Sequence, residues 1–189
     1  MKTHVAILID ESGSMSSVKS DVIGGFNQLL AEQKGNKGEV LTSVTFFNSE
    51  AVREEYVSEP IKKIRKLTDD TYRPGGLTPL LDAIGKTVNS MGKKKNVLFV
   101  IMTDGYENYS KEYTKASVKS LVEEKQGSGW KFLYLGADLE NMSDADGIGI
   151  RSTWAYAMSN TMNVLKSVGQ TICNYSSTGA AAYDGKEIQ

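Results

Sequence analysis

The chain has 189 residues, 40% of them hydrophobic and 24% charged, which is the balance of a soluble globular protein with one sizeable core. Its formal net charge of −1 argues against nucleic-acid binding, because that function needs a surplus of lysine and arginine. The lysines at 93–95 are therefore interpreted as solvated surface charge.

Histidine and cysteine are scarce, with only His4 and Cys173 in the chain. These two residues are too few for a structural zinc site, and a single cysteine cannot form an intrachain disulfide. A Ser-His-Asp triad would need His4 to act from the wrong end of a strand. The apolar run after residue 4 is too short for a signal-peptide core or a membrane span, so we expect a cytoplasmic protein without membrane contact.

The first half of the chain predicts a strand, a helix and a hairpin. An apolar run at 4–9 is typical of a buried strand, and apolar residues at helical spacing predict an amphipathic helix over 17–34. Two glycines inside that helix, Gly24 and Gly25, are expected to pack closely against the sheet. Residues 40–47 and 52–57 predict two strands of a hairpin, the later one near a sheet edge.

The second half continues the alternation of helices and strands. Residues 60–67 predict a short helix or irregular structure, and a helix with an apolar face begins at Leu80. The unbroken apolar run at 97–102 predicts a central strand covered on both faces, followed by a helix at 111–126 and a strand at 130–135. The pattern then weakens to short pieces over 138–160, with an edge strand at 153–158 and a closing helix at 160–176.

These elements predict an α/β fold of three layers. A mostly parallel central sheet, with an antiparallel edge strand, would carry helices on both faces. We expect a single domain over residues 1–176 and a loosely ordered, small and polar tail at 177–189.

Hard oxygen donors follow the first predicted strand. Asp10, Ser12 and Ser14 occupy alternate positions there, which suits a hard cation such as Mg²⁺. The same loop composition also occurs in ordinary turns, so this motif alone leaves both interpretations open.

Two other stretches favour the metal site. Thr78 lies in a glycine-rich loop ahead of a helix, and Asp104 directly follows the central strand at 97–102. In open α/β sheets, ligand sites gather beyond the carboxyl ends of the strands. The three loops therefore have a geometric reason to form one site.

In order and spacing, these three motifs resemble the metal-ion-dependent adhesion site of the von Willebrand factor A (VWA) domain. The resemblance is clear from the first strand to about residue 137. The order of elements also resembles short stand-alone bacterial and phage members of the family, including the tellurite-resistance-associated group.

The resemblance implies a role for each motif residue. Ser12 and Ser14 would bind the metal directly, and Thr78 directly or through water. Asp10 and Asp104 would hold metal-bound waters and orient the hydroxyls. Mg²⁺ is the expected ion, with Mn²⁺ and Ca²⁺ as alternatives, since all accept oxygen ligands.

The resemblance also implies a protein partner that supplies an Asp or Glu side chain to the metal. Glu11, in a variable slot of the motif, is expected to point to solvent near the ion. Three residues that follow Asp104 are expected to stand on the same rim as contact residues: Tyr106, Asn108 and Tyr109.

We therefore predict a Mg²⁺-dependent protein-binding module without catalysis, serving as a scaffold or regulatory subunit. The alternative is a Mg²⁺-dependent phosphatase or phosphotransferase, which also places Asp at strand ends. Against it, the usual second Asp two residues after the first is replaced by Ser12. A third interpretation is a purely structural domain with a vestigial site.

Overall fold

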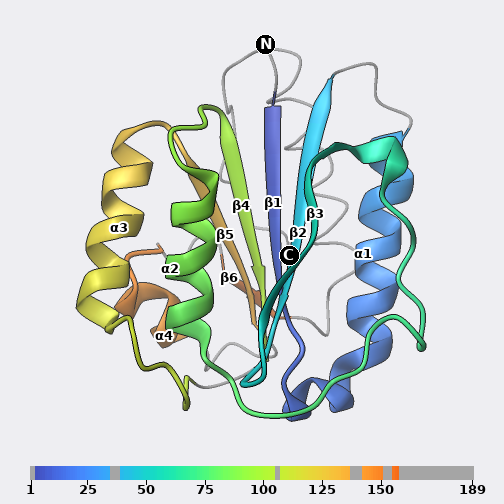
Figure 1. The fold of residues 1–189 in the computed structure, drawn as a ribbon, viewed down its shortest axis with the longest axis horizontal. Coiled ribbons are helices and arrows are strands. Elements are labelled where there is room, and N and C mark those ends of the chain that lie inside the picture. The colour runs from blue at the N-terminus through green and yellow to red at the C-terminus, as the bar shows by residue number, and fades with distance from the viewer. Residues whose placement is uncertain (1–2, 35–38, 105–106, 137–141, 151–154, 158–189) are drawn as a thin grey trace.

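The computed structural model describes residues 3–34, 39–104, 107–136, 142–150 and 155–157. These residues form a six-stranded sheet in the order β3-β2-β1-β4-β5-β6, with helices on both faces (Figure 1). Four predicted features lie outside the described residues: Tyr106, Cys173, the closing helix at 160–176 and the tail at 177–189. In the part of the chain that the structure describes, no helix has the length and apolar character needed to span a membrane.

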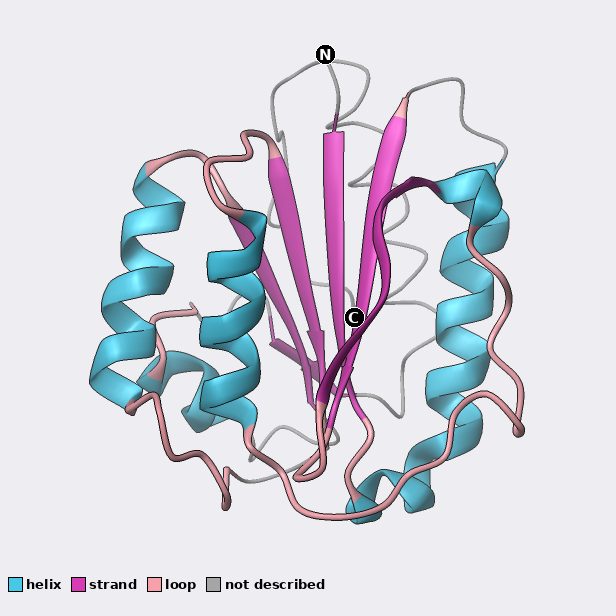
Figure 2. Cartoon of the chain, in the orientation of Figure 1, coloured by secondary structure: helices cyan, strands magenta, loops and turns pink. Residues whose placement is uncertain are grey.

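Strands and helices alternate along most of the chain, as the apolar patterns predict (Figure 2). Its strands are β1 (Thr3–Asp10), β2 (Val40–Phe47), β3 (Val52–Pro60), β4 (Val97–Met102), β5 (Lys131–Gly136) and β6 (Ala155–Ala157). The α-helices are α1 (Lys19–Lys34), α2 (Leu80–Met91), α3 (Lys115–Gly127) and α4 (Met142–Gly147). Two 3₁₀ helices, Gly13–Val18 and Ile61–Lys63, lie in the connections.

The inner strands are parallel and apolar on both faces. β1 pairs in parallel with β2 on one side and β4 on the other, and every residue of β4 is buried. The carboxyl ends of β1 and β4 therefore lie side by side at one edge of the sheet, where Ile9 pairs with Met102. This is the lower edge in Figure 1.

The antiparallel edge strand is confirmed. β3 pairs with β2 alone and runs against it, at the end of the strand order. Its register shifts on either side of Val44, and Ser58 has a positive φ of 52°. Irregular pairing of this kind bends an edge strand and makes it a poor template for further strands.

Two hydrophobic cores cover the two faces of the sheet. Alternate residues of β1 point to opposite faces, so Val5 and Ile7 pack on one side with Phe26 of α1. Ala6 and Leu8 pack on the other side with α2 and α3. Figure 1 shows α1 on one side of the sheet and α2 and α3 on the other.

Several helices and strands begin or end at residues other than those predicted from the sequence. The helix predicted at 17–34 starts instead as the 3₁₀ helix Gly13–Val18 and becomes α-helical at Lys19. α3 begins at Lys115 because Thr114 caps it through a hydrogen bond from the Ser117 amide. The edge strand predicted at 153–158 is the shorter β6, which pairs in parallel with β5.

One packing prediction is wrong. Gly24 is exposed, and a Cβ added there would meet no atom within 4 Å, so close packing does not explain this glycine. Its neighbour Gly25 is buried. Only one of the two glycines therefore lies on the covered face of α1.

Candidate metal centre

Three loops meet beyond the carboxyl ends of β1 and β4. The first begins at Asp10, the last residue of β1, and contains Ser12 and Ser14. The second leads into α2 and contains Thr78, and the third follows β4 with Asp104. Backbone hydrogen bonds join the second loop to the first loop and to the segment after β4.

Asp10 is the most constrained of these residues. Its side chain is fully buried; Oδ1 accepts a hydrogen bond from the Ser12 amide at 2.7 Å, and Oδ2 accepts one from the Thr103 hydroxyl at 2.6 Å. The Tyr72 hydroxyl donates to the Asp10 carbonyl at 2.6 Å. The carboxylate is therefore fixed in one orientation before any ligand arrives.

The two serines link the first loop to the third. Ser12 Oγ and Ser14 Oγ lie 3.2 Å apart, within hydrogen-bond distance, and Ser14 Oγ donates to Asp104 Oδ1 at 2.8 Å. The Asp104 amide also lies 3.1 Å from Met15 Sδ. Hydroxyl and carboxylate oxygens from segments 90 residues apart in sequence thus converge at one point.

The Thr78 loop is attached to the first loop through its glycines. The Gly13 amide donates to the Gly76 carbonyl at 3.0 Å, and the Gly75 amide donates to the Glu11 carbonyl at 2.9 Å. Gly76 has a φ of +78°, and a Cβ there would lie 2.6 Å from Ser49 Oγ. A glycine is needed at this position both for its backbone conformation and for space.

Thr78 is held from the other side by Asn108. The Thr78 amide donates to Asn108 Oδ1 at 2.9 Å, and the Asn108 amide donates to the Thr78 carbonyl at 3.1 Å. This reciprocal pair fixes the backbone of Thr78, whose side chain is buried. Asn108 was expected to contact a partner from the rim; it is exposed, yet it also positions a predicted ligand.

Two acidic residues attach the third segment to the start of α2. Glu107 accepts hydrogen bonds from the amides of Leu81, Tyr109 and Ser110. Asp82 accepts three more, from the amides of residues 111–113. Although burial opposes it, these backbone donors hold the pKa of Asp82 below its usual value. These hydrogen bonds hold the loop that carries Asn108 against the N-terminal end of α2.

Burial makes both candidate carboxylates harder to ionise. It raises the pKa of Asp10 to about 6, against the opposing hydrogen bonds from Thr103 and Ser12, and repulsion from Asp104 adds to the rise. Burial likewise raises the pKa of Asp104, opposed by its hydrogen bond from Ser14. A cation at this point would offset both effects, since its charge stabilises the ionised carboxylates.

The donor set is suited to a hard ion. Every converging side chain presents oxygen, which Mg²⁺ prefers over nitrogen and sulfur. Among the described residues, no cluster of three or more histidine, cysteine or carboxylate side chains could hold a metal. A metal here would therefore depend on hydroxyl ligands as well as carboxylates.

The structure brings together four of the five predicted residues through direct side-chain and backbone contacts: Asp10, Ser12, Ser14 and Asp104. Thr78 joins them through the backbone contacts of its loop. The expectation for Glu11 is wrong. Its side chain is only 13% exposed, with Oε2 paired to Arg53 and Oε1 accepting from the Arg73 amide.

Some residues that shape the site were missed as contributors. Thr103 directly precedes Asp104, and its hydroxyl donates a hydrogen bond to Asp10. Tyr72 and Glu107 carry no local signal, because their partners lie far away in sequence.

Comparison with known proteins identifies the family. The model of the von Willebrand factor type A domain matches residues 4–170, and the chain therefore belongs to the VWA family. Members of this family often mediate metal-dependent protein interactions. No curated protein sequence matches the chain.

Solved structures share the fold at low sequence identity. Proximal thread matrix protein 1 of the mussel byssus is 12% identical, with a TM-score of 0.64 over 91% of this chain and 46% of that one. An aerotolerance-related membrane protein of Bacteroides fragilis is 16% identical, with a TM-score of 0.58 over 90% of this chain and 98% of its own. The manganese-loaded TRAP protein of Plasmodium vivax is 16% identical, with a TM-score of 0.54 over 88% of this chain and 72% of its own.

The lengths of these proteins differ. The chain spans about half the length of the mussel protein but nearly the whole of the Bacteroides fragilis structure. Because sequence identity is only 12–16%, the likeness supports the fold alone.

Proposed function

We propose that this VWA domain is a Mg²⁺-dependent protein-binding module of the adhesion-site type. Ser12, Ser14 and Thr78 would hold the ion, and Asp10 and Asp104 would orient the hydroxyls and the metal-bound waters. Mn²⁺ and Ca²⁺ are the alternative ions. The observation that carries the proposal is the hydrogen-bonded run from Ser12 through Ser14 to Asp104, which joins two separate loops by oxygen atoms alone.

The ligand set explains why a partner would be required. Mg²⁺ takes about six oxygens, and three neutral hydroxyls with two orienting carboxylates satisfy only part of that number. The ion would keep exchangeable water, which an Asp or Glu side chain of a partner replaces. Leu77, beside Thr78 and 47% exposed, offers an apolar contact next to the metal.

The domain would act as a scaffold or regulatory subunit in the cytoplasm and would catalyse no reaction. We place it in residues 1–176, with 177–189 as a tail. Asp10 is not followed two residues later by a second Asp, as a phosphate-transfer nucleophile motif would require.

Calorimetric titration with Mg²⁺ tests the metal site. The wild-type protein is expected to bind one ion, and Asp10→Ala is expected to weaken binding about tenfold or more, because residues that orient ligands matter nearly as much as the ligands. Asp21→Ala is the matched control, since this exposed aspartate lies in the first turn of α1. Equal Mg²⁺ affinity in the wild type and in Asp10→Ala would contradict the assignment of the Mg²⁺ site to these residues.

A further inference from the structure

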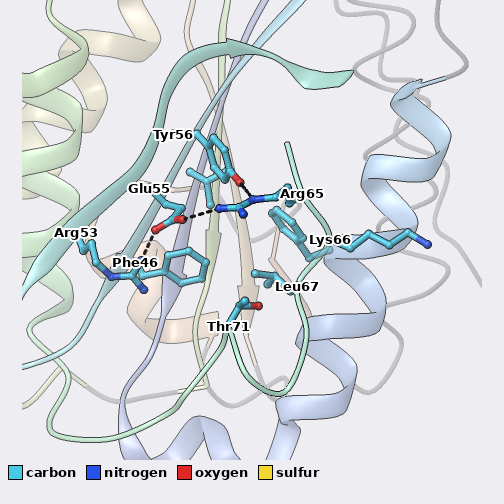
Figure 3. Close-up of a pocket in the computed structure, with 10 residues that line it drawn as sticks. Phe46, Arg53, Glu55, Tyr56, Arg65, Lys66, Leu67 and Thr71 are labelled. Atoms are coloured by element: carbon cyan, nitrogen blue, oxygen red, sulfur yellow. Dashed lines mark hydrogen bonds and ion pairs between the residues drawn. The ribbon is translucent and has the colours of Figure 1, made fainter. Parts of the chain in front are cut away.

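A pocket lies between α1, the β2–β3 hairpin and residues 65–71 (Figure 3). Its volume is about 220 Å³. Pockets for whole small molecules measure ~300–1,000 Å³, so this one has the size for a single bulky side chain. Its floor is apolar and buried, formed by Phe26, Val44, Phe46 and Leu67.

The mouth of the pocket is aromatic and cationic. The Arg53 guanidinium lies 4.8 Å from the centre of the Phe46 ring and pairs with Glu55. Arg65 Nε donates to the Tyr56 hydroxyl at 3.1 Å. Figure 3 shows Arg53 and Arg65 on opposite sides of Glu55, while the Lys66 side chain extends toward α1. An aromatic side chain entering here would meet ring faces and guanidinium planes.

Three of the four charged residues that line this pocket are cationic: Arg53, Arg65 and Lys66, against Glu55. Lys62 and Lys63 precede this lining in the chain, and Lys63 is paired with Glu59 at 3.2 Å. Asp69, the next acidic residue along the chain, is already paired with Lys19 at 3.3 Å. Arg65 is only weakly neutralised, because its contact with Glu55 is 4.0 Å long and its side chain is 82% exposed. The charged residues that line the pocket therefore carry two more positive than negative charges, which favours an acidic ligand.

We propose that this pocket binds an acidic segment of a protein partner, with one aromatic side chain against the apolar floor and flanking carboxylates on Arg65 and Lys66. The site is separate from the proposed metal ligands and needs no metal. It therefore goes beyond the adhesion-site function and stands or falls independently of it.

The test uses NMR titration of the isotope-labelled full chain in the presence of EDTA. The probe is the capped peptide Asp-Glu-Phe-Glu-Asp, with Asp-Glu-Ala-Glu-Asp and Lys-Lys-Phe-Lys-Lys as controls. The phenylalanine peptide is expected to shift the amide signals of residues 53–56 and 65–71. Replacing Phe by Ala is expected to weaken binding about tenfold, because the buried ring supplies most of the apolar contact. The lysine peptide is expected to leave these signals unchanged.

Arg65→Glu and Lys93→Glu form the matched pair of variants, since both reverse one exposed charge and Lys93 lies in the loop after α2. Only Arg65→Glu is expected to abolish the shifts. Arg53 is unsuitable for the test because it also contacts Glu11 in the metal loop. Equal loss in both variants, equal binding of the alanine peptide, or no shift at all would overturn the proposal. Preferential binding of a thymidine oligonucleotide through Arg65 would also overturn it, in favour of nucleic acid.

Discussion

At the scale of single residues, the candidate centre depends on how completely Asp10 is held. Its two carboxylate oxygens accept from Ser12 and Thr103, and its carbonyl accepts from Tyr72. A group fixed in this way needs no reorganisation when an ion binds. The same burial makes its charge unfavourable while no cation is near, which gives the residue a measurable pH signature.

The pKa of Asp10 is raised from 3.8 to about 6 in the folded protein. Between these values the folded state holds a proton that the unfolded state releases, so stability falls as pH rises through this window. The metal-free protein is expected to be more stable at pH 5 than at pH 7, by about 1 kcal/mol from this residue. Thermal unfolding in EDTA at the two pH values measures this difference in stability. Asp10→Asn is expected to lose this part of the pH dependence, and identical profiles for the two proteins would contradict the account.

Mg²⁺ is expected to reverse that trend. Protonated Asp10 cannot support a cation, so Mg²⁺ affinity falls as pH drops through about 6. Stabilisation by added Mg²⁺ is therefore expected at pH 7 and largely absent at pH 5.

Asn108 gives a prediction that local sequence patterns did not provide. Asn108→Ala removes the side-chain oxygen that accepts a hydrogen bond from the Thr78 amide. It leaves the hydrogen bond from the backbone amide of residue 108 to the Thr78 carbonyl. We expect Mg²⁺ affinity to fall about tenfold, because the ligand loop loses one of its two fixed points. Calorimetric titration measures the change. The control is Asn89→Ala on α2, which removes an exposed hydrogen bond to the Tyr113 hydroxyl. This variant is expected to leave the Mg²⁺ affinity unchanged.

At the scale of elements, the apolar strands were predicted well because their burial leaves little choice of residue. β4 matches the predicted run at 97–102, and β2 matches 40–47. Helix starts were predicted less well. Nothing in the apolar spacing marks the 3₁₀ helix Gly13–Val18, which forms where the first metal loop turns into α1. The start of α3 is set by the Thr114 cap, a polar signal that apolar spacing does not record.

Two glycines in helices provide an opposed pair of predictions. A Cβ at Gly85 of α2 would overlap the ring of Tyr113, whereas one at Gly24 of α1 would meet nothing. Gly85→Ala is expected to destabilise the protein by about 1–3 kcal/mol through overpacking. Gly24→Ala is expected to stabilise it by up to about 1 kcal/mol, because alanine favours the helix. Chemical denaturation measures both, and a stabilising Gly85→Ala would show that the α2 contact is misplaced.

At the scale of the whole molecule, the centre is a product of topology. β1 and β4 are neighbours in the sheet although residues 11–96 separate them in the chain, so the sheet brings Asp10 and Asp104 to one edge. That convergence was predictable from two apolar strands each followed by an aspartate. The residues that hold the centre in place were not predictable from local patterns: Tyr72, Glu107 and Asn108. Their hydrogen-bond partners lie 26 to 62 residues away in the sequence.

The two proposed sites also adjoin each other. Arg53, at the mouth of the pocket, contacts Glu11, which lies between Asp10 and Ser12. A partner with acidic residues could engage the ion and the pocket together, and linked contacts of this kind strengthen binding without new surfaces. The domain would then recognise a longer acidic segment than the metal alone could hold.

The most direct measurement of the central claim is paramagnetic broadening of the amide NMR signals by Mn²⁺ below stoichiometric amounts. The account predicts that all three loops broaden together, at residues 11–14, 76–78 and 103–104, and that excess Mg²⁺ restores the signals. Ser14→Ala is expected to reduce this broadening, and Ser16→Ala, an exposed serine in the same 3₁₀ helix, is expected to leave it intact. Broadening scattered over surface carboxylates, or confined to one loop while residues 76–78 stay sharp, would contradict a shared ion.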